Sequence, residues 1–243
     1  MRQTLLIIIA SFMCMLASAQ DDGNYEYNKE FIWGVQKNTN GGLIGGFIFK
    51  KSKAINDRTF RTYGLELMNV KHPKEDKRVS PQSGNTYIFG KRYYLYSVRL
   101  QTGFERILFK KAPQQGVQIL YGASIGPTIG LEAPYYVEVV NGAGDGIERV
   151  HYDPTKADAD HSSGKIVGTG RLFQGLFRSN IVPGLNAKAS MSFEFGTFKS
   201  NVTGFEVGLN FEAFPREICL IPVEHNQSIF TSAFITLFYG NRR

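Results

Sequence analysis

The feature that most constrains the fold is a regular alternation of apolar and polar residues along much of the chain. Over 185–195 and again over 205–213, the odd positions are apolar and the even positions are polar, small or glycine. Similar runs occupy 94–104 and 117–131. A strand sends alternate side chains to opposite faces, whereas a helix would scatter these apolar residues around its axis. The pattern predicts an all-β chain, and Pro127 predicts a bulge or an early strand end in its run.

Strand length and composition indicate the kind of sheet. The alternating segments run to roughly 10–15 residues, longer than the usual strand, and this length fits a strand tilted across a bilayer. Their polar faces carry glycine and small polar residues beside isolated charges, as expected for the inside of a membrane barrel. A hydrophobic share of 42% with 13% aromatic residues excludes a disordered chain. We therefore predict a transmembrane β-barrel rather than a soluble sandwich.

Eight antiparallel strands are expected, and an even number places both chain ends on the periplasmic side. The connections 54–57, 112–116 and 197–200 read as short periplasmic turns. The connections 72–90, 133–183 and 215–227 read as longer external loops, after a tight first connection at 39–42. The expected strands span 30–38, 43–53, 58–71, 91–109, 117–132, 184–196, 201–214 and 228–240.

The first nineteen residues have the organisation of an export signal. Arg2 precedes an apolar stretch over 5–16, and Ala17-Ser18-Ala19 offers the small residues of a cleavage site. An uncleaved anchor helix and lipoprotein processing at Cys14 are the alternatives. Removal of 1–19 leaves a mature barrel, 20–243, whose single cysteine, Cys219, cannot form an internal disulfide.

A signal peptide followed by eight alternating strands resembles the small outer-membrane β-barrel proteins of Bacteroidota, a group that includes the PorT-like proteins, and more loosely the OmpX/OmpW type. The stretch 232–240 resembles the aromatic C-terminal strand that barrel-insertion machinery recognises, although here Asn241-Arg242-Arg243 follows it. The resemblance implies the outer membrane of a Gram-negative cell. It also implies a role as a secretion or assembly accessory, an adhesin or a membrane stabiliser, among which fold alone does not choose.

The predicted interior is charged. An eight-stranded barrel is just wide enough to be filled by its own side chains, so a general-diffusion porin is not expected. Acids and bases mixed in a narrow lumen predict a hydrogen-bonded core of salt bridges, with a proton or ion path as the alternative. The residues expected to point inward are Glu66, Arg99, Gln101, Glu105, Lys188, Glu194, Glu206 and Glu212.

No catalytic centre, cofactor site or metal site is predicted. Asp160-His161-Ser162-Ser163 places acid, imidazole and hydroxyl side by side, but triads are assembled in space, and a solvated loop explains this stretch better. All four histidines, His72, His151, His161 and His225, fall in expected external loops. Together with a lone cysteine, they lack the spacing of metal ligands.

Two surface features remain in the expected external loops. The basic run 71–78 lies where lipopolysaccharide phosphates would be, so Lys71, Lys74, Lys77 and Arg78 are candidate contacts. The long loop 133–183 predicts a hairpin from 135–140 and 147–152. It also predicts a short amphipathic helix over 171–179, which either caps the barrel or docks a partner. The helix residues expected to dock are Leu172, Phe173, Leu176 and Phe177.

Together these features predict a non-enzymatic outer-membrane barrel, a structural or accessory subunit of an envelope protein complex. Its expected partners are outer-membrane lipid, lipopolysaccharide and other membrane proteins, without nucleic acid. A lipid A-modifying enzyme and a carrier of small apolar molecules are the alternative functions.

Overall fold

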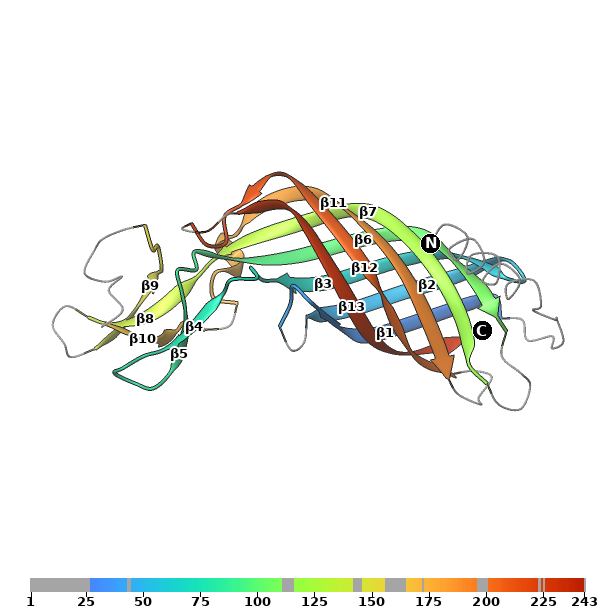
Figure 1. Ribbon diagram of the computed structural model, residues 1–243, viewed down its shortest axis with the longest axis horizontal. Helices are drawn as coiled ribbons and strands as arrows, with labels where there is room; N and C mark the ends of the chain where they lie inside the picture. The colour runs from blue at the N-terminus through green and yellow to red at the C-terminus, as the bar shows by residue number, and fades with distance from the viewer. Residues whose placement is uncertain are drawn as a thin grey trace, which may run out of the picture.

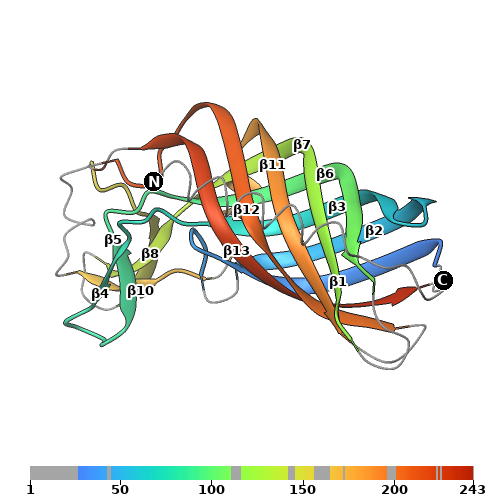
Figure 2. The same ribbon diagram turned by 45° about the vertical axis from the view of Figure 1, so that its right-hand side comes forward.

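The computed structural model describes residues 27–42, 45–110, 116–141, 146–155, 165–171, 173–195, 201–222, 224 and 226–242. Eight strands close into an antiparallel barrel in the order β1-β13-β12-β11-β7-β6-β3-β2 (Figures 1 and 2). The predicted all-β barrel fold, with one long loop, is therefore confirmed. The barrel strands are β1 (Lys29–Asn38), β2 (Gly46–Asn56), β3 (Thr59–Val70), β6 (Tyr93–Phe109), β7 (Gln118–Pro134), β11 (Asn180–Phe195), β12 (Asn201–Ile218) and β13 (Gln227–Arg242).

The alternation in the sequence becomes alternation between the two faces of the wall. In β1, exposed and buried residues follow one another without interruption from Lys29 to Asn38. The strands lie within a few residues of the predicted ranges, and the largest differences are at the start of β11 and the end of β12, which extend four residues further than predicted. The expectation at Pro127 is wrong. β7 continues through it and keeps one register with β11, because the strand accommodates Pro127 on its exposed face with only a short gap in its pairing to β6.

The barrel has two unlike ends. One end carries the described chain ends, Lys29 of β1 and Arg242 of β13, together with the connections β2–β3, β6–β7 and β11–β12. At the β2–β3 turn, the side-chain oxygen of Asn56 accepts hydrogen bonds from the backbone of Arg58 and Thr59, at 3.1 and 2.8 Å. We call this end the turn end and the opposite one the loop end.

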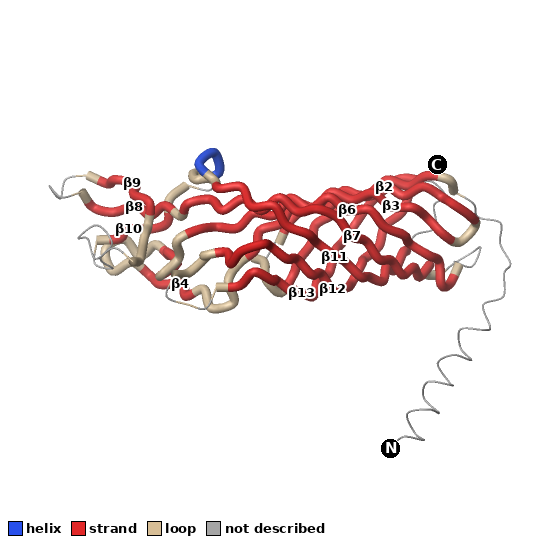
Figure 3. The backbone as a smooth tube through the Cα atoms, turned by 90° about the horizontal axis from the view of Figure 1, so that it is seen from above, coloured by secondary structure: helices blue, strands red, loops and turns tan. Residues whose placement is uncertain are grey.

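A second structure lies beyond the loop end (Figures 1 and 3). β4 (Asp76–Val79) and β5 (Thr86–Phe89) form a hairpin, while β8 (Tyr136–Val140), β9 (Ile147–His151) and β10 (Ile166–Thr169) form a three-stranded sheet. These five strands are called the extension. The predicted hairpin is confirmed as β8–β9, whereas β4, β5 and β10 were not expected. The buried core of the extension consists of Tyr87, Ile88, Tyr135, Val137, Val139, Tyr152 and Ile166.

The predicted amphipathic helix over 171–179 is wrong. Among the described residues of this stretch, Leu176–Arg178 alone is helical, as the 3-10 turn η2. Phe173 has φ 61°, outside the right-handed helical region. Gly175 packs so closely on β7 that a Cβ would lie 2.4 Å from the carbonyl oxygen of Pro134. The segment is therefore a tight turn that folds onto the rim of the barrel. In the described part of the chain, helices do not reach the length and apolarity that a membrane crossing requires.

Candidate functional site

The outer face of the barrel is apolar on every strand. Trp33 of β1 is 51% exposed, and Leu237 of the neighbouring β13 is 60% exposed. Soluble monomers rarely expose a continuous apolar surface of this kind. The exposed apolar residues of the wall include Phe31, Val35, Phe47, Phe49, Tyr63, Leu67, Leu100, Phe104, Tyr121, Ile125, Ile129, Ile181, Leu185, Met191, Phe195, Leu209, Phe211, Ile229, Ile235 and Tyr239.

The inner face carries a network of buried ion pairs. Arg99 donates to Glu212 through Nε and Nη2, at 3.2 and 2.8 Å, and lies 3.4 Å from Glu66. Lys188 connects Glu66 to Glu206 across the lumen, with N–O distances of 2.8 and 3.0 Å. All five side chains are buried. The network thus joins strands that are not adjacent in the barrel.

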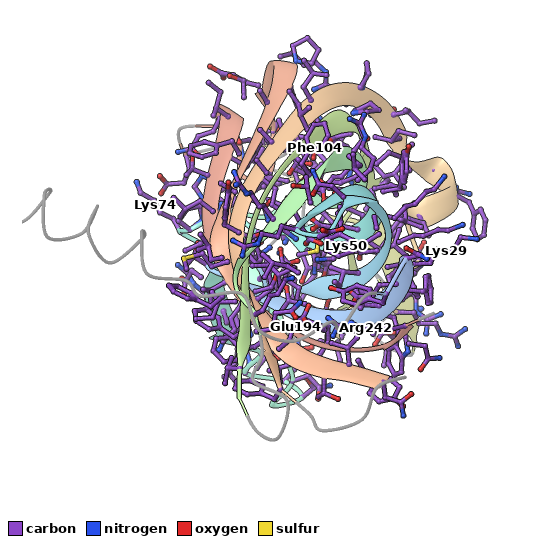
Figure 4. The ribbon with its side chains drawn as sticks, turned by 90° about the vertical axis from the view of Figure 1, so that its right-hand side faces the viewer. Lys29, Lys50, Lys74, Phe104, Glu194 and Arg242 are labelled. Carbon is purple, nitrogen blue, oxygen red and sulfur yellow. The ribbon has the colours of Figure 1, made fainter. Side chains whose placement is uncertain are left out.

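Lys50 continues this network toward the turn end. It pairs with Glu105 and lies 3.7 Å from Glu206. Figure 4 looks along the barrel from the turn end, with Lys50 inside the ring of strands and Lys29 on its outer side. A cavity of ≈ 20 Å³ lies among Lys50, Glu105, Lys188 and Glu206, which is room for about one water molecule. Side chains therefore fill this level of the lumen.

A second cluster lies inside the turn end. Arg242 pairs with Glu30 at 2.5 Å and with Glu194, and its guanidinium lies 4.0 Å from the centre of the Tyr27 ring. Glu194 and Arg242 lie next to each other in Figure 4. The cluster links β1, β11 and β13, so it holds the two terminal strands of the barrel together from inside.

The predicted salt-bridge core is confirmed, and each of its eight predicted residues is buried. Sequence reasoning missed Lys50, Glu30 and Arg242. Lys50 stands in the run Lys50-Lys51-Ser52-Lys53, where charges fall on both faces and obscure the alternation. Arg242 lies beyond the predicted end of the last strand, although continuing the period of two from Phe234 and Phe238 would have placed it inside.

Two of the four candidate phosphate-binding residues pair with an acidic side chain in the structure. Lys74 pairs with Glu224 at 2.7 Å, and Arg78 pairs with Asp76 at 2.9 Å and lies over the ring of Phe89. Lys77 is exposed and Lys71 is half-buried. Two of the four predicted contacts thus already have an acidic partner within the chain, and phosphate binding stays a prediction.

Lys91, at the rim of the barrel, is buried and pairs with a residue of the basic run 71–78. Lys91 is 0% exposed, pairs with Glu75 and lies 4.2 Å from the centre of the Tyr94 ring. Burial lowers the pKa of Lys91 below its ordinary value, although the neighbouring Glu75 raises it. Because Glu75 directly precedes β4 and Lys91 follows β5, the ion pair holds the base of the β4–β5 hairpin together.

The candidate docking residues are only partly brought together. Phe177 is 100% exposed and Phe173 is 54% exposed, with the Phe173 ring 5.7 Å from that of Tyr96. Leu176 is half-buried, and Leu172 lies outside the described residues. A cavity of ≈ 10 Å³ lined by Tyr94, Tyr96, Tyr136, Arg171 and Phe173 adjoins this turn.

All four histidines were expected in external loops, and the structure describes two of them. His72 is buried in the connection before β4, and His151 lies at the end of β9 between the rings of Tyr93 and Tyr136. His161, with its neighbours Asp160 and Ser162, and His225 lie outside the described residues. In the part of the chain that is described, His, Cys, Asp and Glu do not gather in groups of three or more that could hold a metal ion.

Comparison with known proteins adds little to this geometry. No protein family model matches the chain, and no curated protein matches it. Among solved structures, the N-terminal β-barrel domain of Pseudomonas aeruginosa OprF is similar at 8% identity and a TM-score of 0.36, over 89% of this chain and 98% of that one.

Two further solved structures are similar to this chain, with comparably low sequence identity and TM-score. Neisserial surface protein A has 10% identity and a TM-score of 0.34, over 89% of this chain and 95% of that one. Ail, the attachment invasion locus protein of Yersinia pestis, solved with the heparin analogue sucrose octasulfate, has 9% identity and a TM-score of 0.34, over 90% of this chain and all 100% of that one. Similarity this remote does not indicate what the present chain does.

Proposed function

We propose that this chain is an outer-membrane β-barrel that acts as an accessory subunit of an envelope complex, binding a protein partner at its loop end. The apolar wall on all eight strands is the observation that carries the membrane location. Hydrocarbon tails cover such a surface without leaving backbone groups unsatisfied, because a closed barrel has no free edge.

The side chains that fill the lumen favour a role other than transport. Buried ion pairs occupy it at two levels, and an unpaired charge left there would be costly. The groups available to other molecules are therefore on the outside. Among them, Phe177 is fully exposed on the turn that joins the extension to β11.

Under this proposal the turn end faces the periplasm and the extension faces outward. The short connections and both barrel termini gather at one end, as in bacterial barrels with short periplasmic turns. A signal peptide over 1–19, which lies outside the described residues, would direct export. The resemblance to PorT-like proteins of Bacteroidota belongs to the same proposal.

Photo-crosslinking in living cells tests the partner surface. A photoreactive amino acid replaces Phe177, and the matched control replaces Ile125, which is 60% exposed on the wall of β7. We expect a protein adduct of defined mass from position 177, and mainly lipid adducts from position 125. The same partner should co-purify with the wild type in mild detergent.

Two results would contradict the proposal. Lipid adducts alone at position 177 would mean that Phe177 only extends the apolar wall. A strictly monomeric barrel, with no partner retained in mild detergent, would remove the accessory role.

A further inference from the structure

A patch of five basic side chains lies on the outer face of the wall at the turn end. Its residues are Lys29 of β1, Lys51 and Lys53 of β2, Arg61 of β3 and Arg106 of β6. Arg61 is half-buried and the other four are exposed. These strands are consecutive neighbours in the barrel, so the patch covers one continuous sector.

The pairing register brings three of these charges into one row. Lys29 is the direct partner of Lys53, and Lys53 is the direct partner of Arg61. Side chains directly opposite on neighbouring strands have Cβ atoms about 5 Å apart, and like charges at that position destabilise a sheet. The arrangement is therefore unfavourable unless an anion lies against it.

Within the described residues, no carboxylate neutralises the patch. None of its five side chains has an ion-pair partner, and Asp57 in the adjoining turn does not reach them. Eight other basic residues do have acidic partners: Lys50, Arg99, Lys188 and Arg242 in the lumen, and Lys74, Arg78, Lys91 and Arg216 at the loop end. Arg61 lies over the Phe104 ring, at 4.5 Å from its centre.

The order of outward residues fits a bilayer interface. Moving from the turn end, Lys29 is followed by Phe31 on β1, and Lys51 by Phe49 on β2. β3 gives Arg61, Tyr63 and then Leu65, and β6 gives Arg106 and then Phe104, with Phe109 exposed nearer the end of the strand. Each strand thus passes from a cation to an aromatic ring and on to the apolar wall, the order of headgroup, interface and acyl chains.

The opposite sector lacks this order. At the turn end, the outward residues of β11, β12 and β13 include Phe195, Thr203 and Tyr239. Arg242, the cation nearest the end of β13, forms ion pairs with Glu30 and Glu194 inside the lumen. Among the described residues, the outward-facing positive charge of the barrel strands at the turn end is therefore concentrated in one sector.

We infer that this patch binds the phosphodiester headgroup of an anionic phospholipid in the periplasmic leaflet. The inference rests on the proposed membrane location and orientation. Lys29, Lys53 and Arg61 contact the phosphate, while the acyl chains lie along the wall beside Phe31, Phe49 and Trp33.

Trp33 provides the probe. It is the single tryptophan of the sequence, is 51% exposed on β1, and lies four residues from Lys29. Four residues of strand span about 13 Å, so the acyl chain of a lipid bound at Lys29 runs next to the indole. Phospholipids with brominated acyl chains quench tryptophan fluorescence on contact.

The experiment measures Trp33 quenching with the full-length mature protein in phosphatidylcholine vesicles. Brominated phosphatidylglycerol or brominated phosphatidylcholine is added in graded amounts, and the ratio of their association constants is determined. The test variant is Lys29→Gln/Lys53→Gln/Arg61→Gln. The control Lys37→Gln/Lys165→Gln/Arg171→Gln removes the same charge from the loop end and the extension.

We expect the wild type and the control to prefer phosphatidylglycerol, and the test variant to lose that preference. Each cation near an anionic surface contributes about a fivefold preference, so the ratio falls on the order of a hundredfold at low ionic strength. Quenching by phosphatidylcholine stays unchanged in all three proteins, which shows that the variant is still inserted.

An undiminished preference in the test variant, or an equal loss in the control, would overturn the inference. Reversal of the preference by millimolar inorganic phosphate would mean that the patch is a site for free phosphate instead. Failure of the proposed membrane location has a separate signature, because neither brominated lipid would then quench Trp33.

Discussion

Arg99 neutralises two carboxylates where water has little access. It is 2% exposed, and Glu66 and Glu212 beside it are 2% and 1% exposed. Glu66 has a second cation in Lys188, whereas among the described residues Glu212 forms an ion pair with Arg99 alone. Removal of Arg99 would therefore leave Glu212 as a buried charge without a partner.

We expect Arg99→Met to lower the free energy of unfolding by about 3–5 kcal/mol, the usual cost of breaking a buried ion pair. Urea unfolding of the protein in vesicles, followed by Trp33 fluorescence, measures the change. Arg99→Met/Glu212→Leu should recover most of the loss because both charges are gone. Arg171→Met, at an exposed site, should change little. A single variant as stable as the wild type would mean that solvent reaches Glu212.

At the level of single residues, the sequence predicts most of the barrel interior and little of the surface chemistry. Where apolar and polar residues alternate without ambiguity, as around Arg99 and Glu206, each side chain lies on the predicted face. Lys50 was missed because adjacent lysines put charge on both faces. The pairing of Lys74 with Glu224 was also invisible, since the two residues are 150 positions apart and meet only in the folded chain.

The extension is the element that distinguishes this molecule from a plain barrel. Only Tyr135 separates β7 from β8, so the strand leaves the wall and continues outward with little change of direction (Figure 1). Asp153, just after β9, ties the sheet back to the rim. It accepts hydrogen bonds from the backbone and hydroxyl of Thr155, at 3.1 and 2.6 Å, and lies 3.2 Å from Arg92.

Asp153 should make the attachment of the extension sensitive to acid. Burial raises the pKa of Asp153, but the hydrogen bonds from Thr155 and the charge of Arg92 outweigh burial and hold the pKa below its ordinary value. A carboxyl with a lowered pKa in the folded state stabilises above its unfolded value of about 3.9, and that contribution is lost as the pH falls further.

We therefore expect Asp153→Asn to reduce the free energy of local opening of β8 and β9 by about 1–3 kcal/mol at neutral pH. The difference between the wild type and the variant should shrink as the pH falls below about 4. Hydrogen exchange, corrected for intrinsic rates, measures both. Asp76→Asn removes an exposed partner of Arg78 and should cost less than about 1 kcal/mol. A difference that persists at acid pH would contradict the role of the carboxylate.

Elements were predictable where a local pattern decides them. The β8–β9 hairpin followed from two short apolar runs around a glycine-rich turn. β10 was not expected, because it exists through its pairing with β8 rather than through a pattern of its own. The helix predicted over 171–179 failed because the backbone at Phe173 and the packing of Gly175 on Pro134 override the helical spacing of the apolar residues.

At the scale of the whole molecule, the two ends of the barrel axis differ in structure and chemistry. The apolar wall occupies the middle and the basic patch lies at the turn end. The extension lies beyond the loop end, as Figure 3 shows. The two ends therefore offer different chemistry to the two sides of a membrane. Both the partner surface at Phe177 and the lipid site at Lys29 depend on which end faces outward.

Single cysteines at the two ends test this orientation. In a Cys219→Ser background, Lys77→Cys marks the extension and Asp57→Cys marks the β2–β3 turn, and both positions are exposed. A membrane-impermeant maleimide should label position 77 in intact cells, and position 57 only after the outer membrane is permeabilised.

The labelling pattern also separates the two proposals. Labelling of position 57 alone in intact cells would invert the barrel and move the basic patch to the outer leaflet, against the proposed phospholipid site. Labelling of both positions would mean that the wall is not embedded in the outer membrane, and the apolar residues would then need a protein surface to cover them. Only the first pattern, 77 without 57, keeps the cations of the turn end among periplasmic headgroups and leaves Phe177 available outside.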